Sequence, residues 1–204
     1  MVNKKTRKRI RGIFAIEGEW FTDLRDGVSF KPLLDIIKVL HNSPYVHRDA
    51  ATRQELFYYL QKWTQKRYAS YPILYLGFHG EAETIKVGDG RGKDCQVTLD
   101  DLMENLQGLC SGRIIYIGSC STMQIDERRL QRFLQQTGAL AICGYKVQIE
   151  MLRSAAFELL LFNALLDKTL NLNGVKAMKN KILREERALV KELGFRMVVR
   201  KNHK

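Results

Sequence analysis

Short apolar runs alternate with amphipathic segments along most of the chain. The runs are bounded by glycine, proline or polar residues, and this pattern is typical of strands buried on both faces of a parallel sheet. The expected strands cover residues 13–16, 45–48, 73–77, 114–117, 139–142 and 195–200. A hairpin arm is also expected at residues 84–87, and the last strand is expected at an edge of the sheet.

Between these runs, apolar residues recur at helical spacing. The expected helices cover residues 32–40, 52–68, 98–106, 126–137, 151–166 and 175–191. Thr52 with Glu55 three residues later forms a capping box at the start of one helix, and Gly138 is placed to end another. Strands alternating with helices predict an α/β protein, a three-layer sandwich with a mainly parallel, flavodoxin-like sheet of about six strands.

Two of the expected strands are followed by reactive residues. The run at residues 73–77 leads to His79 and Gly80, and the run at residues 114–117 leads to Cys120, which stands between Ser119 and Ser121. The loops that leave the carboxyl ends of parallel strands form the ligand crevice of such sheets. We therefore expect His79 and Cys120 to share one crevice.

A histidine beside a cysteine is the arrangement that nucleophilic catalysis by a thiol needs. The imidazole promotes the thiolate, which is the nucleophile, and later protonates the leaving group. A glycine such as Gly80 lets backbone N–H groups approach the developing oxyanion without a Cβ atom in the way. The other cysteines are Cys95, Cys110 and Cys143, and none forms a C-x-x-C pair. We therefore expect reduced thiols, a cytoplasmic location and no metal site.

These residues carry a resemblance to a known family. A strand ending in His-Gly, followed about forty residues later by a strand ending in a small residue and Cys, resembles the caspase-like cysteine peptidases. That family includes caspases, metacaspases, gingipains, separases and CHAT-type bacterial proteases. The chain also resembles a small group of uncharacterised bacterial single-domain proteins with the stretches Glu-Gly-Glu-Trp (17–20) and Gly-Ser-Cys-Ser (118–121).

The resemblance implies a hydrolase with a His79/Cys120 dyad acting on a protein or peptide substrate. The backbone N–H groups of Gly80 and Cys120 would form the oxyanion hole. The thiolate would attack a peptide carbonyl, expel the amine and leave an acyl-enzyme for water to hydrolyse. No metal and no organic cofactor takes part in that reaction.

Substrate selection is where the chain departs from its relatives. Two residues before the cysteine, caspases carry glutamine and metacaspases carry aspartate, whereas this chain has Gly118. The resemblance places four residues in the substrate pocket: Gly118 itself, Glu17 and Glu19 just after the first strand, and Tyr145 after the strand at 139–142. An acidic residue there favours arginine or lysine at the cleavage position, although Glu17 could equally be a solvated loop charge.

The charge is concentrated at the two ends of the chain. The net charge is +12, yet residues 1–11 carry six basic residues and no acidic one, and residues 176–204 carry ten basic and three acidic. We therefore predict a basic arm at residues 1–11 and one domain at residues 12–204. No stretch is long and apolar enough to span a membrane.

Two other functions fit the same pattern. The first is a non-catalytic caspase-like module that binds a protein, a nucleic acid or another acidic partner through its basic ends. The second is a flavodoxin-like domain that binds a phosphate compound. The glycine-rich segment 88–93 suggests a phosphate loop, but it lacks the required spacing and Asp94 follows Lys93, where a phosphate loop has Ser or Thr. A hairpin turn is the better interpretation of that segment.

Overall fold

The central sheet has six strands. The computed structural model describes residues 10–202 except 24, 26, 89–92 and 168, so most of the expected basic arm lies outside the described residues. The strands lie in the order β2 (Tyr45–Asp49), β1 (Ile13–Glu17), β3 (Ile73–Gly77), β7 (Ile114–Ile117), β8 (Ala141–Tyr145) and β9 (Phe195–Val199). The first five run parallel, and β9 pairs antiparallel with β8 at the edge. This confirms the mainly parallel sheet.

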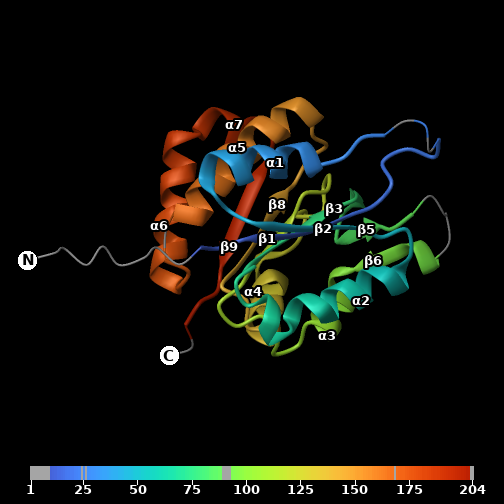
Figure 1. The fold of residues 1–204 in the computed structure, drawn as a ribbon. Coiled ribbons are helices and arrows are strands. Elements are labelled where there is room, and N and C mark those ends of the chain that lie inside the picture. The colour runs from blue at the N-terminus through green and yellow to red at the C-terminus, as the bar shows by residue number, and fades with distance from the viewer. Residues whose placement is uncertain (1–9, 24, 26, 89–92, 168, 203–204) are drawn as a thin grey trace, which may run out of the picture.

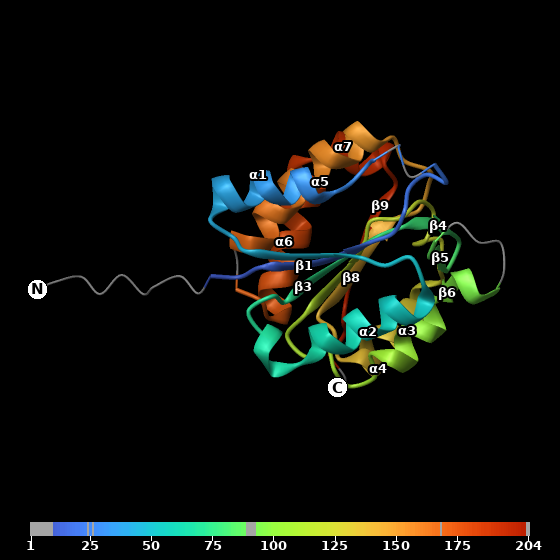
Figure 2. The ribbon, with the colours of Figure 1, turned by 45° about the vertical axis from the view of Figure 1, so that its right-hand side comes forward.

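Helices cover both faces of this sheet (Figure 1). One face carries α1 (Lys31–His41), α5 (Met151–Asp167), α6 (Leu172–Glu185) and α7 (Arg187–Glu192); the other carries α2 (Arg53–Thr64), α3 (Leu99–Asn105) and α4 (Glu127–Thr137). Figure 2 shows the three layers from a second direction. The predicted three-layer α/β sandwich is confirmed.

The pleat of the central strands divides the core in two. In β3, Ile73 and Tyr75 pack into the cluster under α1, α5 and α6, whereas Leu74 and Leu76 pack into the cluster over α2, α3 and α4. Successive side chains of a strand point to opposite faces, so a strand between two helical layers must be apolar at every position. That requirement explains the unbroken apolar runs.

Several local signals act as predicted. The Thr52 side chain accepts a hydrogen bond from Glu55 N, and the Glu55 side chain accepts one from the Thr52 backbone N–H, so the capping box is complete. The helix α4 ends at Gly138, whose φ of 79° is left-handed and suits glycine.

Other boundaries differ from the predictions. The strand expected at 139–142 is β8 at 141–145, and Gly144 lies inside it: a Cβ atom there would stand 2.4 Å from the Ile117 carbonyl oxygen. This glycine therefore allows close packing and does not end the strand. The basic helix expected at 175–191 is two helices, α6 and α7, that meet at Glu186 (φ −108°, ψ 31°). Neither glycine nor proline marks that break in the sequence.

A second, three-stranded sheet stands beside the carboxyl ends of the central strands. It consists of β4 (His79–Glu81), β5 (Thr84–Lys86) and β6 (Gln96–Thr98), paired antiparallel. The hairpin arm at 84–87 was predicted, but β6 was not. Most of the segment 88–93, which the alternative phosphate-binding interpretation needs, lies outside the described residues. None of the helices in the described chain is long and apolar enough to cross a membrane.

Candidate active site

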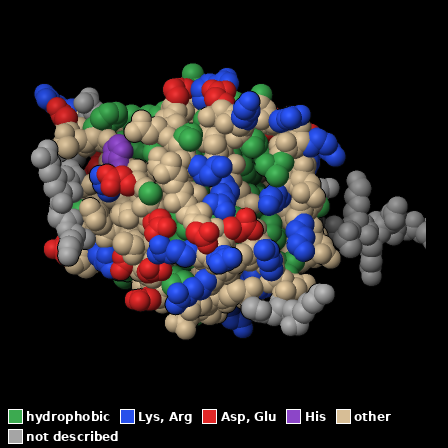
Figure 3. Space-filling model, turned by 180° about the vertical axis from the view of Figure 1, so that it is seen from behind, with side chains coloured by type: hydrophobic (Ala, Val, Ile, Leu, Met, Phe, Trp, Pro, Cys, Tyr) green, Lys and Arg blue, Asp and Glu red, His purple; other side chains and the backbone are tan. Residues whose placement is uncertain are grey.

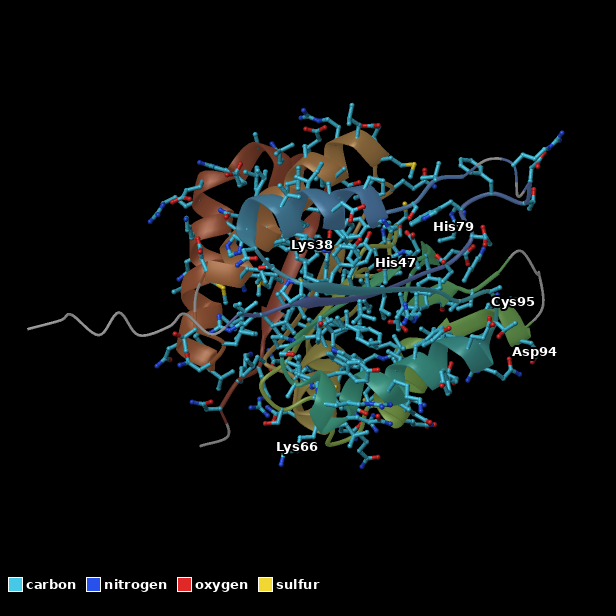
Figure 4. All side chains as sticks on the ribbon, viewed as in Figure 1. Lys38, His47, Lys66, His79, Asp94 and Cys95 are labelled. Carbon is cyan, nitrogen blue, oxygen red and sulfur yellow. The ribbon has the colours of Figure 1, made fainter. Side chains whose placement is uncertain are left out.

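The carboxyl ends of β3 and β7 open into a pocket of about 450 Å³. Its wall comes from five places: the loop after β1, the first turns of α1, Tyr75 within β3, the segments that follow β3 and β7, and the first half of α5 with the residue Ile149 before it. Both His79 and Cys120 line this pocket. Figure 4 shows His79 at this end of the sheet, on the same side as His47. The structure therefore brings the two predicted residues to one crevice.

A backbone carbonyl orients His79. The residue begins β4, two positions beyond β3, and its Nε2 lies 2.7 Å from the Trp20 carbonyl oxygen. A carbonyl can only accept a hydrogen bond, so Nε2 carries the proton, and in the neutral ring Nδ1 keeps its lone pair. The Trp20 indole also packs edge-on against the imidazole, with ring centroids 5.4 Å apart. The ring is thus held with a proton-accepting nitrogen available.

A tight turn presents Cys120 three residues after β7. The next residue, Ser121, has a left-handed φ of 57°, and its N–H donates to the Val147 carbonyl at 3.1 Å. Left-handed backbone in a residue other than glycine stores strain of about 1 kcal/mol or more, and such strain concentrates at functional sites. Within the described chain the Cys120 N–H makes no hydrogen bond. This donor is therefore available to a ligand oxygen.

The hairpin strand β4 packs tightly against the cysteine turn. A Cβ atom on Gly80 would lie 2.6 Å from the Cys120 carbonyl oxygen and 2.5 Å from Thr122 Cγ2. A hydrogen bond from the Phe78 N–H to Ser119 Oγ, at 3.3 Å, also joins the segment after β3 to the segment after β7. The glycine after the histidine is thus required by the close approach of the two loops, whatever its role toward an oxyanion.

Glu17 is buried and already bonded. Its carboxylate accepts hydrogen bonds from His47 Nε2 at 2.7 Å, from the Phe30 N–H at 2.8 Å and from the Ser29 hydroxyl. Burial alone would raise the pKa of Glu17, but these hydrogen bonds outweigh it and lower the pKa. The carboxylate therefore fastens the segment at Ser29 and Phe30, which forms part of the pocket wall, and it is not itself in the lining.

The other residues predicted for the substrate pocket lie in different places. Gly118 lines the pocket, and a Cβ atom there would stand within 2.7 Å of the Tyr75 ring. Glu19 is exposed outside the lining, and Tyr145 is fully buried within β8, not beyond the end of a strand as expected. Of the four predicted pocket residues, Gly118 alone is part of the described lining.

One group of side chains has donor atoms close enough together to hold a metal ion. In the described part of the chain, Glu17, His47 and Asp49 offer ligand atoms within 4.8 Å of one another. His47 Nε2 bonds Glu17 directly, and the Asp49 side chain is 71% exposed. The bond between Glu17 and His47 joins the end of β1 to β2.

The base of the pocket contains an acid that the sequence analysis missed. Glu158 of α5 lines the pocket although it is only 3% exposed. Its Oε1 accepts hydrogen bonds from the hydroxyls of Tyr116 at 2.5 Å and Tyr145 at 3.1 Å. Burial raises the pKa of Glu158 to about 8, and the two tyrosine hydrogen bonds only partly oppose that rise. A signal existed: Glu158 lies in register with Leu161 and Leu165 on the apolar face of its helix.

Comparison with known proteins places the chain in a family. The model of a family described as "Family of unknown function (DUF6642)" matches residues 11–199. The chain belongs to this family. Comparison with curated proteins gives no match. The family's match runs from just before β1 to the end of β9 and so includes every element of the pocket.

Solved structures show the fold of this DUF6642 member. It is similar to the crystal structure of caspase-1 from Spodoptera frugiperda, with a TM-score of 0.53 and 12% sequence identity. The match covers 88% of this chain and 81% of that chain. The resemblance expected from the sequence is therefore supported at the level of the fold, which is caspase-like.

The remaining cysteines differ from Cys120 in their surroundings. Cys110 and Cys143 are fully buried, and burial raises the pKa of the Cys110 thiol to about 12 and that of Cys143 as well. Cys95 is partly exposed and comes directly before β6, which is separated from His79 in β4 by the middle strand β5, and it is outside the described lining of the pocket. Cys120 is the one cysteine in the described pocket lining.

Proposed function

We propose that this protein is a cysteine peptidase in which Cys120 is the nucleophile and His79 is the general base and acid. The observation that carries the proposal is the joint position of the two side chains in one pocket, with His79 Nε2 on the Trp20 carbonyl. This hydrogen bond directs the proton-accepting Nδ1 away from Trp20. A thiol paired with an oriented imidazole is the arrangement that acyl transfer requires.

The proposed reaction has two halves. His79 Nδ1 accepts the thiol proton, and the Cys120 sulfur attacks the substrate carbonyl to form a tetrahedral intermediate. The Cys120 N–H, together with the predicted Gly80 N–H, stabilises the oxyanion, and the imidazolium then protonates the departing amine. A water molecule, deprotonated by His79, hydrolyses the thioester. Free thiol, acid and amine account for all atoms, and no cofactor is needed.

Active-site labelling tests this proposal. A peptide-based electrophile should label Cys120, identified by mass spectrometry, and C120A should abolish that labelling. In H79A the labelling rate should fall at least about tenfold, because general base assistance contributes about 10²–10⁴-fold. The variant C95A is the matched control and should be labelled like the wild type. Equal labelling of Cys95 and Cys120, or labelling that H79A leaves unchanged, would contradict the proposal.

The alternative is a non-catalytic module that binds an acidic partner, and one surface favours it. A groove along the edge strand β9 is lined by five basic residues, Lys176, Lys179, Arg196, Arg200 and Lys201. Figure 3 shows many Lys and Arg side chains on the back of the molecule, interspersed with Asp and Glu. Glu127 lies 3.7 Å from Arg196 and 3.8 Å from Lys201, which offsets part of this charge. Salt-dependent binding to a polyanion without any Cys120 labelling would favour this module.

A further inference from the structure

Two oxygen atoms in the pocket have no hydrogen-bond partner. Within the described chain, Glu158 Oε2 and the Tyr75 hydroxyl make no hydrogen bond, although each residue is 3% exposed. Neither atom is among the polar atoms fully sealed from solvent there, and both residues line the pocket. Buried polar groups are almost always hydrogen-bonded, so two free oxygen atoms on residues that line one pocket point to a polar ligand group.

The rest of the pocket is apolar. Aromatic rings of Trp20, Phe30 and Phe78 form much of its wall, and Phe30 stacks on Tyr75 with ring centroids 3.8 Å apart. No Lys or Arg lines the pocket among the described residues. The pocket therefore offers apolar walls, electron-rich aromatic rings and a carboxyl group, and its described lining has no lysine or arginine to receive a negative ligand.

Taking the peptidase function proposed above as the starting point, we propose that this pocket receives the lysine or arginine side chain at the cleavage position of the substrate. The hydrocarbon stem lies along the aromatic wall, and the cationic head donates to Glu158 Oε2 and to the Tyr75 hydroxyl. Gly118 lines the same pocket, and a Cβ atom there would stand 2.6 Å from the Tyr75 hydroxyl, so glycine at this position leaves room for the Tyr75 side chain. Glu158, and not Glu17, is then the acid that selects the substrate.

Charge balance supports a basic side chain over an apolar or an acidic one. An apolar side chain would cover both free oxygen atoms without pairing them, which costs affinity. An acidic side chain would face a carboxyl group, and the described lining has no lysine or arginine to pair with it. A cationic head stabilises the ionised carboxylate, so the proton held by Glu158 in the empty pocket passes to solvent when the ligand binds. The only bond broken in this step is the carboxyl O–H bond.

A matched peptide panel tests the assignment. The peptides are identical except at the cleavage position, which carries lysine, arginine, norleucine or aspartate; norleucine reproduces the lysine stem without its charge. For the wild type, kcat/KM with lysine or arginine should exceed that with norleucine by at least about 10-fold, as charge-assisted hydrogen bonds allow. In E158Q this ratio should fall to near 1 while norleucine cleavage is retained, and Y75F should reduce it less. E104Q, at an exposed site on α3, is the control.

The outcomes separate the two proposals. A preference for norleucine or aspartate, or a lysine preference that E158Q leaves intact, overturns the assignment of Glu158 and leaves the peptidase in place. If no peptide is cleaved, the peptidase proposal fails, and calorimetry with n-butylammonium and n-butanol decides about the pocket. If n-butylammonium binds at least about 10-fold more tightly than n-butanol and E158Q loses this difference, the pocket is selective for cations. If the two compounds bind equally, or neither binds detectably, the assignment of the pocket is overturned.

Discussion

Replacing Glu158 by glutamine should change how the stability of the protein depends on pH. The substitution keeps the size of the side chain and an acceptor for the hydroxyls of Tyr116 and Tyr145. It removes the ionisation. Because burial raises the pKa of Glu158 from 4.5 to about 8 in the folded state, the folded protein holds a proton that the unfolded chain has released between these values. Stability therefore falls as pH rises from about 4.5 to about 8, and then levels off.

The size of the effect follows from the pKa difference. Each unit of difference corresponds to about 1.4 kcal/mol, so full ionisation of Glu158 would cost on the order of 5 kcal/mol. Rearrangement of the pocket and entry of water reduce this cost, and we expect a loss of at least about 2 kcal/mol. The neighbouring tyrosines do not obscure it, because burial raises the pKa values of Tyr75, Tyr116 and Tyr145 well above their ordinary value.

Chemical denaturation of wild type and E158Q at pH 4 to 9.5 measures this loss. At pH 4, where Glu158 is protonated in both the folded and the unfolded chain, the two unfolding free energies should agree to within about 1 kcal/mol, as for a neutral isosteric replacement. At pH 9 the variant should be the more stable by at least about 2 kcal/mol. E104Q should follow the wild type at every pH. A difference between wild type and E158Q that does not change with pH would refute the reasoning about the buried acid.

Two further substitutions test the supports of the pocket. In G80A, the new Cβ atom would stand 2.6 Å from the Cys120 carbonyl oxygen and 2.5 Å from Thr122 Cγ2. We therefore expect denaturant titration to show a destabilisation of about 1–3 kcal/mol, together with slower labelling of Cys120. G27A, where nothing lies within 4 Å of the new atom, is the control, and an equal loss of stability in both variants would argue against the contact. In E17Q, loss of charged hydrogen bonds should cost about 2 kcal/mol or more at pH 7. The pKa of Glu17 is lowered in the folded protein, so the stability that the ionised carboxylate contributes is lost as Glu17 becomes protonated. The difference in unfolding free energy between wild type and E17Q should therefore shrink below pH 4.5, and a difference that stays constant down to pH 3 would contradict this account.

Much of the fold could be predicted from local patterns. Each buried strand shows as an unbroken apolar run because helices cover both of its faces, and signals such as the Thr52 capping box or Gly138 act within a few residues of themselves. The nearness of the segments that follow β3 and β7 was also predictable, because neighbouring parallel strands end at the same edge of the sheet. The presence of His79 and Cys120 in the lining of one pocket follows from this property of parallel sheets.

The interior of the pocket was not predictable in that way. Glu17 and Glu158 are both acids beside apolar runs, and nothing local shows which one is bonded to a histidine and which one lines the pocket. The answer depends on Tyr116 and Tyr145, which come from two other strands and meet Glu158 only when α5 packs on the sheet.

The sequence alone therefore determined the layers of the fold and the edge of the sheet at which the pocket lies, because apolar periodicity and turn residues act over short distances. Tertiary structure decided which acidic side chains are fully hydrogen-bonded and which one lines the pocket. Burial and hydrogen-bond partners control the state of an ionisable group, and in this protein those partners come from segments far apart in the chain.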